Sequence, residues 1–221
     1  GTPVHKYEDG ISMNAIWAVP SLGIDPATGQ EIYVDRKGNK TFEWDADNMV
    51  VCGDETQKYR GTFSINGEYN GWGINVSCSY FGGGQYYNQT LVDKVENVDM
   101  NYNVDKRVLS GRWLYPGQIA QFKRLGKLSV DTDGDGQVET VNEKTRATSR
   151  FVQDYNELDI SSINVYYDFS NEFLNKLNIG LERLKLAVNM NDVARISTVK
   201  AERGTTYPFA RTVSCSLTAT F

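Results

Sequence analysis

Histidine and cysteine are scarce in this chain of 221 residues. The single histidine, His5, argues against a histidine-based catalytic triad or metal cluster. The three cysteines, Cys52, Cys78 and Cys215, are far apart and odd in number. They therefore provide neither a disulfide framework nor the paired spacing of a zinc site.

The chain also lacks an excess of positive charge and any long hydrophobic run. Its net charge is −5 and its pI is about 5.0, which argues against a surface for nucleic acid or anionic membranes. No apolar run approaches the ~18 residues of a transmembrane helix, which excludes helical membrane proteins but not β-barrels. The first residues, "GTPVHKYEDG", match neither a signal peptide nor a lipidation motif. We expect that a targeting segment has been removed or that the chain begins within a longer protein.

Alternation of apolar and polar residues is the main positive signal. Asn70-Gly71 predicts a two-residue type I′ hairpin turn, since both positions of that turn need positive φ. The register set by this turn gives the hairpin one apolar face and one face that is polar except at Phe81. A slip of one residue would exchange the two faces, so the register is strongly specified. The predicted apolar pairs are Tyr69–Trp72, Gly67–Ile74, Ile65–Val76, Phe63–Cys78 and Gly61–Tyr80.

The length of this hairpin fits a membrane. Tyr59 to Tyr69 covers roughly 33 Å at ~3.3 Å per residue. Tilted by ~40°, it spans roughly 25 Å, which is the height of the apolar band on an outer-membrane barrel. Aromatic residues lie near both ends, as an interfacial girdle requires. A strand pair of a soluble β-sandwich alternates in the same way, so the hairpin alone leaves both architectures open.

Further strands and their connections favour the barrel. We predict antiparallel strands at about 58–69, 72–82, 152–169, 182–190 and 207–221. Long segments at about 18–57, 83–150 and 191–206 alternate with short turns, which is typical of outer-membrane barrels and unusual for a sandwich. The short turns then face the periplasm and the long segments form extracellular loops. The predicted fold class is all-β, and because five or six strands cannot close such a barrel, we expect the chain to be its C-terminal part.

The chain ends on "RTVSCSLTATF", in which alternation continues to the last residue. Val213, Cys215, Leu217, Ala219 and Phe221 fall on one face of a strand. Terminal residues usually fray, so this ending points to a role for Phe221 itself.

Five long phrases carry a family resemblance. They are "IWAVPSLGIDPATGQEIYV" (16–34), "WDADNMVVCGD" (44–54), "GGQYYNQTLVDKVENVDMNYNVDKRVL" (83–109), "RATSRFVQDYNEL" (146–158) and "NMNDVARISTVKAERGTTYPFARTVS" (189–214). The chain, almost from end to end, closely resembles the C-terminal region of SusC/RagA-type TonB-dependent outer-membrane transporters of Bacteroidetes.

The resemblance implies a plugged barrel of about 22 strands in the outer membrane of a Gram-negative bacterium. Such proteins import oligosaccharides or peptides, are not enzymes, are driven by the TonB complex, and work beneath a SusD-like surface lipoprotein. The signal peptide, the plug and the TonB-contacting segment would lie upstream. A final aromatic resembles the signal that the barrel-assembly machinery reads, which would give Phe221 roles in assembly and in anchoring at the periplasmic interface.

One motif, "VDTDGDGQVET", resembles a calcium loop. Acidic residues stand at positions 1, 3 and 5, and Gly136 stands at the sharp turn. Position 12 is Asn142 where a bidentate acid is expected, so a solvated acidic loop tip is the alternative. The family resemblance does not cover this motif, so a Ca²⁺ ion here would be structural. The candidate ligands are Asp131, Asp133, Asp135, Gln137 and Glu139.

Other candidate residues have simpler explanations. Asp25 and Asp45 lie in turn-rich contexts and are predicted to be turn residues rather than an acid–base pair. A short apolar stripe predicts a packed loop helix; it consists of Leu91, Val92, Val95 and Val98. A basic set either contacts the SusD-like lipoprotein or, more simply, forms a solvated loop surface; it consists of Lys106, Arg107, Arg112, Lys123, Arg124 and Lys127. The alternative to a transporter is a soluble extracellular carbohydrate-binding β-module with a calcium site.

Overall fold

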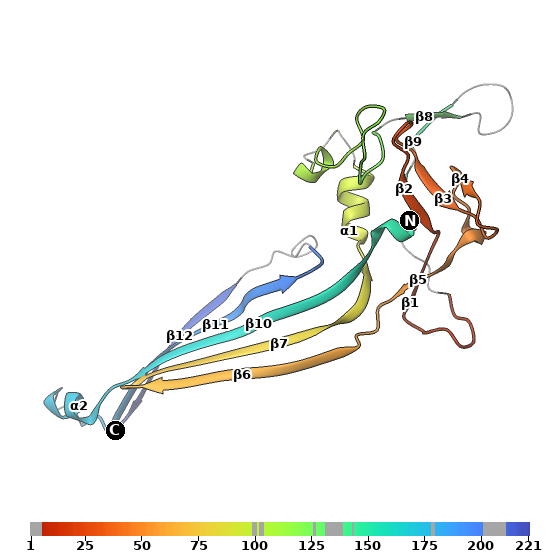
Figure 1. The fold of residues 1–221 in the computed structure, drawn as a ribbon. Helices are drawn as coiled ribbons and strands as arrows, with labels where there is room; N and C mark the ends of the chain where they lie inside the picture. Colours follow the sequence, from red (N-terminus) through yellow and green to blue (C-terminus); the bar gives the residue numbers. More distant parts are fainter. Residues whose placement is uncertain are drawn as a thin grey trace. The chain divides into compact units, whose positions relative to one another are not determined.

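The computed structural model describes residues 6–98, 101, 104–125, 127–130, 139–142, 144–177, 180–200 and 211–221 (Figure 1). The chain divides into two compact units. The first, which we call the loop unit, comprises Gly1–Thr56 and Gly84–Asp154. The second, the sheet unit, comprises Gln57–Gly83 and Tyr155–Phe221.

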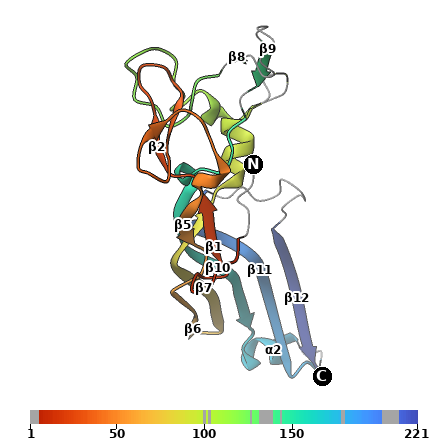
Figure 2. The same ribbon diagram turned by 90° about the vertical axis from the view of Figure 1, so that its right-hand side faces the viewer.

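The sheet unit is built on five strands in the order β6-β7-β10-β11-β12. The strands are β6 (Tyr59–Tyr69), β7 (Trp72–Tyr87), β10 (Val152–Asp168), β11 (Arg183–Ser197) and β12 (Thr212–Thr220). The short helix α2 (Asn171–Leu177) connects β10 to β11. Figures 1 and 2 show the five strands as one open sheet. This arrangement confirms the predicted all-β class, with strands that do not close into a barrel by themselves.

The β6–β7 hairpin has the register that the sequence predicts. Tyr69 lies opposite Trp72, and the pairing continues in step to Tyr59 opposite Gly82. Asn70 and Gly71 have φ values of 47° and 83°, as a type I′ turn requires. A side chain at Gly71 would also meet the backbone carbonyl of Asp168 at 2.6 Å, so both backbone conformation and space require glycine there.

The sheet has one apolar and one polar face. Leu186 lies opposite both Tyr167 and Leu217, whereas Asn189 lies opposite both Asn164 and Ser214. Trp72 and Tyr167 bring their rings to 4.9 Å on the apolar face. That face carries Phe63, Ile65, Tyr69, Trp72, Ile74, Val76, Ile163, Val165, Tyr167, Leu184, Leu186, Val188, Met190, Val213, Leu217 and Ala219.

Two strands are longer than the sequence predicts. β7 continues to Tyr87 and β11 to Ser197, so the loops expected to begin at 83 and 191 start later. Glycines suggest a break in β7, but Gly83 takes φ 79° within the strand. The letters "NMND" suggest a turn in β11, but Asp192 takes φ 52° and the β10–β11 register shifts beside it. Such a β-bulge bends a strand without ending it. Residues 207–210, where the last strand was expected to begin, lie outside the described residues.

The loop unit contains small sheets and short helices, most of them within the segments predicted as long loops. Its sheets are β1-β5, β2-β3-β4 and β8-β9. The strands are β1 (Ala15–Ala18), β2 (Ser21–Ile24), β3 (Glu31–Val34), β4 (Lys40–Thr41), β5 (Val50–Asp54), β8 (Lys127–Val130) and β9 (Glu139–Asn142). The short helices are η1 (Ala46–Asn48), α1 (Gln89–Leu91), η2 (Val92–Glu96), η3 (Lys106–Val108) and η4 (Ser149–Phe151). No helix among the described residues is long and apolar enough to cross a bilayer.

One apolar core holds the loop unit together. Val92 and Val95 are fully buried, and Leu91 and Val98 pack against the same core. This confirms the packed loop helix that the apolar stripe predicts. Asn88 caps the helix, since its side-chain oxygen accepts a hydrogen bond from the amide of Leu91 (3.0 Å). The core consists of Ile16, Tyr87, Val92, Val95, Val108, Phe122 and Phe151.

Candidate functional site

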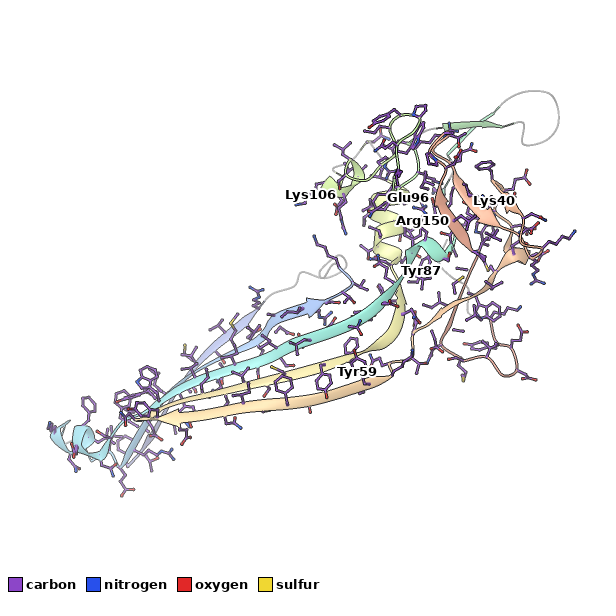
Figure 3. All side chains as sticks on the ribbon, viewed as in Figure 1. Lys40, Tyr59, Tyr87, Glu96, Lys106 and Arg150 are labelled. Atoms are coloured by element: carbon purple, nitrogen blue, oxygen red, sulfur yellow. The ribbon has the colours of Figure 1, made fainter. Side chains whose placement is uncertain are left out.

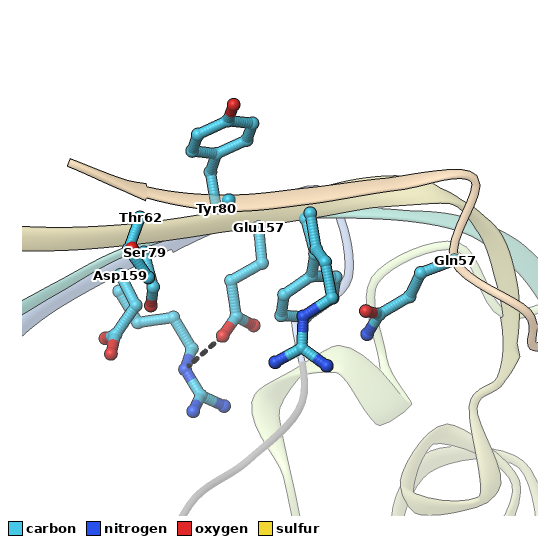
Figure 4. Close-up of a pocket in the computed structure, with 10 residues that line it drawn as sticks. Gln57, Thr62, Ser79, Tyr80, Glu157 and Asp159 are labelled. Atoms are coloured by element: carbon cyan, nitrogen blue, oxygen red, sulfur yellow. Dashed lines mark ion pairs between the residues drawn. The ribbon is translucent and has the colours of Figure 1, made fainter.

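A pocket of about 510 Å³ lies on the polar face of the sheet unit (Figure 4), and ligand sites commonly measure ~300–1,000 Å³. Thr62, Ser79, Glu157 and Asp159 point to one side of the sheet, and Tyr80 points to the other (Figure 4). We call this site the polar pocket. It is lined by Gln57, Arg60, Gly61, Thr62, Ser79, Tyr80, Phe81, Glu157, Asp159 and Arg195.

Both acids of the polar pocket are held within its wall. Glu157 is buried, with 4% of its side chain exposed, and its carboxylate lies 2.9 Å from Nε of Arg195. The hydroxyl of Tyr155 donates to the other carboxylate oxygen at 2.8 Å. Asp159 lies directly across the β10–β11 pair from Arg195 and accepts a hydrogen bond from Ser161 at 3.2 Å. Glu157 is therefore engaged at both carboxylate oxygens, and it fixes Arg195 in place.

Several hydrogen-bond donors line the polar pocket. Arg60 is exposed and forms no ion pair or hydrogen bond with any other residue that the structure describes. The side chain of Arg195 is 36% exposed. Thr62 and Ser79, which pair across β6 and β7, add hydroxyl groups. Next to them the rings of Phe81 and Tyr155 meet edge-on at 5.0 Å.

A change of phase in β10 brings the two acids to this face. Towards the α2 end of β10, even-numbered Asn164 lies on the polar face, with its amide in reach of Asn75 and Asn189. Beyond the register shift between Ile160 and Ser162, odd-numbered Glu157 and Asp159 lie on that face instead. Without this irregularity the strict period of two would place both carboxylates on the apolar face.

A second polar cluster lies on the same face near the Asn70-Gly71 turn. The hydroxyl of Tyr166 donates to Glu68, and Nζ of Lys185 lies 3.6 Å from the centre of the Tyr166 ring. The Tyr166 ring crosses β7 at Gly73, where any side chain would overlap it. Glycine at that position therefore allows tyrosine to link three strands.

The loop unit contains a buried charge cluster (Figure 3). Nη2 of Arg150 lies 2.8 Å from Glu31 and 2.6 Å from Glu96, and both carboxylate side chains are 0% exposed. Nε of Arg150 donates to the second oxygen of Glu31 at 3.1 Å, and Nη1 donates to the carbonyl of Gln121 at 2.7 Å. We call these three charged residues the Arg150 cluster. It joins β3, η2 and η4, so its chemistry is structural: a guanidinium that neutralises two buried acids.

Electrostatics in this cluster favour the charged form of Arg150. Burial alone would lower the pKa of Arg150, but hydrogen bonds and charge from Glu31 and Glu96 outweigh burial and raise it above its ordinary value. Arg112 lies nearby and is 1% exposed. It donates to the carbonyls of Val108 (3.0 Å) and Lys123 (2.8 Å). Burial lowers the pKa of Arg112, and the charge of Glu96 acts in the opposite direction.

The predicted calcium ligands are not tested. Asp131, Asp133, Asp135 and Gln137 lie outside the described residues, and only the backbone of Glu139 is described, as the start of β9. Among the residues that the structure does describe, no cluster of three or more His, Cys, Asp or Glu side chains has the arrangement of a metal site.

The two aspartates predicted as turn residues have that role. Asp25 accepts hydrogen bonds from the Thr28 hydroxyl (2.6 Å) and from two backbone amides, and the Thr28 hydrogen bond is the main cause of its lowered pKa. Asp45 caps η1 by accepting a hydrogen bond from the amide of Asp47 at 3.0 Å. Neither arrangement provides an acid–base pair.

The basic loop set is only partly a solvated surface. Arg112 and Lys123 are 1% and 4% exposed, so the prediction was wrong for both. Their burial follows from long-range packing around Phe122, which the spacing of charges does not reveal. Phe221, the predicted assembly signal, follows β12 and is 81% exposed.

Comparisons with known proteins point to one kind of membrane receptor. No protein-family model matches the chain. The TonB-dependent receptor P39 of Formosa agariphila is 26% identical over 168 residues, which are 75% of this chain and 15% of that receptor. A solved structure of the RagAB peptide transporter is similar over 85% of this chain and 19% of its own, with a TM-score of 0.61 at 14% identity. A structure of the RagAB peptide importer in the closed-closed state gives a TM-score of 0.57 at 16% identity, over 82% of this chain and 19% of its own.

These similarities agree with the phrases that carry the resemblance in the sequence. The chain spans less than a fifth of the length of the receptor P39 and of the solved transporters. The solved structures establish the fold, and the curated relative supplies the similarity in sequence. The chain is thus similar in sequence to part of a TonB-dependent receptor and in fold to part of the RagAB transporter, which supports the resemblance to SusC/RagA-type TonB-dependent receptors.

Proposed function

We propose that the chain forms part of an outer-membrane importer of oligosaccharides or peptides, which is driven by TonB and works with a SusD-like lipoprotein. The observation that carries this proposal is the sheet with one apolar and one polar face, together with its likeness to the RagAB transporter. In a barrel, the apolar face meets lipid and the polar face lines the lumen. Transport, rather than catalysis, is then the role of the polar face.

The apolar face supports a lipid environment. Ile65, Trp72 and Leu217 are 58%, 59% and 67% exposed in the sheet unit. Aromatic rings gather where β7, β10 and α2 meet, as expected at a membrane interface: Tyr167 and Phe169 lie 4.9 Å apart, and Phe169 and Phe173 lie 5.4 Å apart. This end then faces the periplasm, and the segments predicted as long loops would be extracellular.

The proposed cargo and partners are those suggested by the similar proteins and by the sequence resemblance. Peptides are the cargo named for the RagAB transporter, and oligosaccharides are the other cargo class that the sequence resemblance implies. TonB itself would contact segments outside this chain. The barrel-assembly machinery would recognise the last strand.

We expect uptake to depend on both the receptor and TonB. Cells would be given mixed pools of mass-labelled peptides and oligosaccharides, with the full-length receptor present, with its gene deleted, and with TonB deleted. Accumulation of cargo should disappear in both deletion strains, because an outer-membrane importer has no other energy source. Uptake that is unchanged without TonB would contradict the proposal. The carbohydrate-binding alternative predicts instead that the isolated chain is monodisperse without detergent, where part of a barrel should aggregate.

Phe221 provides a test of assembly. Replacing it with aspartate in the full-length receptor should lower the amount of heat-modifiable barrel in the outer membrane severalfold, because the change removes the terminal aromatic and places a charge near the interface. Thr220→Asp is the matched control, since Thr220 lies on the polar face opposite Arg183. Equal barrel levels in the two variants would exclude a specific role for Phe221.

A further inference from the structure

We propose that the polar pocket binds a carboxylate group of the cargo. The inference rests on the proposed function, because that function places the polar face towards the barrel lumen. It goes further by assigning a binding site and the chemistry that the site recognises.

The first step concerns the acids. Glu157 is buried and bound by Arg195 at 2.9 Å and by Tyr155 at 2.8 Å. Asp159 faces Arg195 across the strand pair and receives the Ser161 hydroxyl. Because both oxygens of Glu157 already have partners, a cation that approached Glu157 would have to displace bonds that shape the wall.

The second step concerns the cations. Arg60 is exposed at the rim of the polar pocket and pairs with no other described residue through an ion pair or hydrogen bond. Arg195 is held in place by Glu157 yet remains 36% exposed. A guanidinium offers a planar fork of donors that matches a carboxylate. The pocket thus presents one exposed guanidinium, that of Arg60, and one that Glu157 holds in place, that of Arg195.

The third step concerns the floor between them. The hydroxyls of Thr62 and Ser79 come from directly opposed positions on β6 and β7. Both groups donate hydrogen bonds, and so does the amide of Gln57, which also lines the pocket. The aromatic pair of Phe81 and Tyr155 lies alongside, with ring centres 5.0 Å apart. A carboxylate with an apolar or ring-shaped neighbour fits this surface.

Two kinds of cargo carry that chemistry: peptides, through their C-terminus or acidic side chains, and oligosaccharides that contain uronic acids. The experiment therefore uses both. Cells with the full-length receptor receive peptides as free acids and as C-terminal amides, and uronic-acid oligosaccharides with and without reduction of their carboxyl groups. Mass spectrometry gives the uptake ratio of acid to neutral form for each pair.

We expect the wild-type receptor to favour the acid form of at least one kind of cargo by about 10- to 100-fold, as a hydrogen bond to a charged group implies. Arg60→Gln should bring that ratio close to one, and Arg60→Lys should retain part of it. Arg183→Gln is the control, since Arg183 lies at the α2 end of the same sheet, in an ion pair with Asp168. The kind of cargo whose acid-to-neutral uptake ratio falls in Arg60→Gln identifies the source of the carboxylate.

Two results would overturn the inference, and they are distinguishable. If acid and neutral forms are taken up equally by the wild type, or if Arg60→Gln keeps the wild-type ratio, the carboxylate site is wrong and the importer stands. If the wild type takes up no probe of either kind, the proposed import function fails and the site fails with it.

Discussion

Replacing Arg150 with alanine is expected to destabilise the loop unit by about 3–5 kcal/mol, because it removes the guanidinium that pairs with two buried carboxylates. Glu31 and Glu96 are both 0% exposed and share one guanidinium group. The change also removes the donor to the carbonyl of Gln121. The donors of nearby Arg112 are directed to backbone carbonyls rather than to these carboxylates.

The measurement is the urea dependence of proteolytic cleavage in the loop unit of the purified full-length receptor. Arg150→Lys should fall between alanine and wild type, because lysine supplies charge but not the fork that meets both oxygens of Glu31. Arg146→Ala is the matched control. Arg146 is exposed and stacks on Trp44 at 4.8 Å, so its loss should cost only about 0.5–1 kcal/mol.

A triple variant separates the charge from the packing. Replacing Arg150 with methionine and both Glu31 and Glu96 with glutamine removes all three charges at once. Because it leaves no uncompensated buried charge, this variant should recover much of the stability lost in Arg150→Ala. Cleavage curves for Arg150→Ala that coincide with those of Arg146→Ala would show that the cluster does not hold the unit together.

The sequence predicts those parts of the fold whose cause is local. The β6–β7 register follows from two facts that agree: Asn70-Gly71 requires positive φ, and a single register keeps the apolar residues on one face. The structure confirms both. The predicted strand ends at about 82 and 190 were wrong for an equally local reason. Glycine and an Asn-Asp pair are typical of turns. In the structure, pairing with neighbouring strands continues past both positions, so they are irregularities within longer strands.

The candidate site is less accessible to such reasoning because it depends on residues far apart in the chain. The Arg150 cluster joins residues 119 and 54 positions apart, and no pattern in the sequence links them. In the polar pocket, Arg60, Glu157 and Arg195 come from three different strands. One signal was present: the alternation in "ELDISSINV" changes phase between Asp159 and Asn164. A phase change within one strand indicates a bulge, and that would have placed the two acids on the polar face.

Placing an arginine on the apolar face is the second change with a large expected effect. Leu217→Arg should cost about 2–4 kcal/mol if the side chain lies near the middle of a bilayer. Leu217 is near the centre of β12 and is 67% exposed in this chain. The same substitution at its neighbour Ser216, which pairs with Ala187 on the polar face, should cost little. The measurement is the free energy of unfolding of the full-length receptor in lipid vesicles, followed in urea.

Depth distinguishes a lipid-facing surface from a soluble core. At the interface an arginine costs about 0–1 kcal/mol, because its long side chain reaches water. Ala219 lies on the same face as Leu217 and is two residues before the terminal Phe221. In a membrane, Ala219→Arg should therefore cost clearly less than Leu217→Arg. In a soluble sandwich both positions would meet a second protein layer, and the cost would follow burial rather than position along the strand. Equal losses of unfolding free energy in Leu217→Arg and Ala219→Arg would thus contradict the barrel. A larger loss at Leu217 than at Ala219, with little loss in Ser216→Arg, would assign lipid to one face and the lumen to the other.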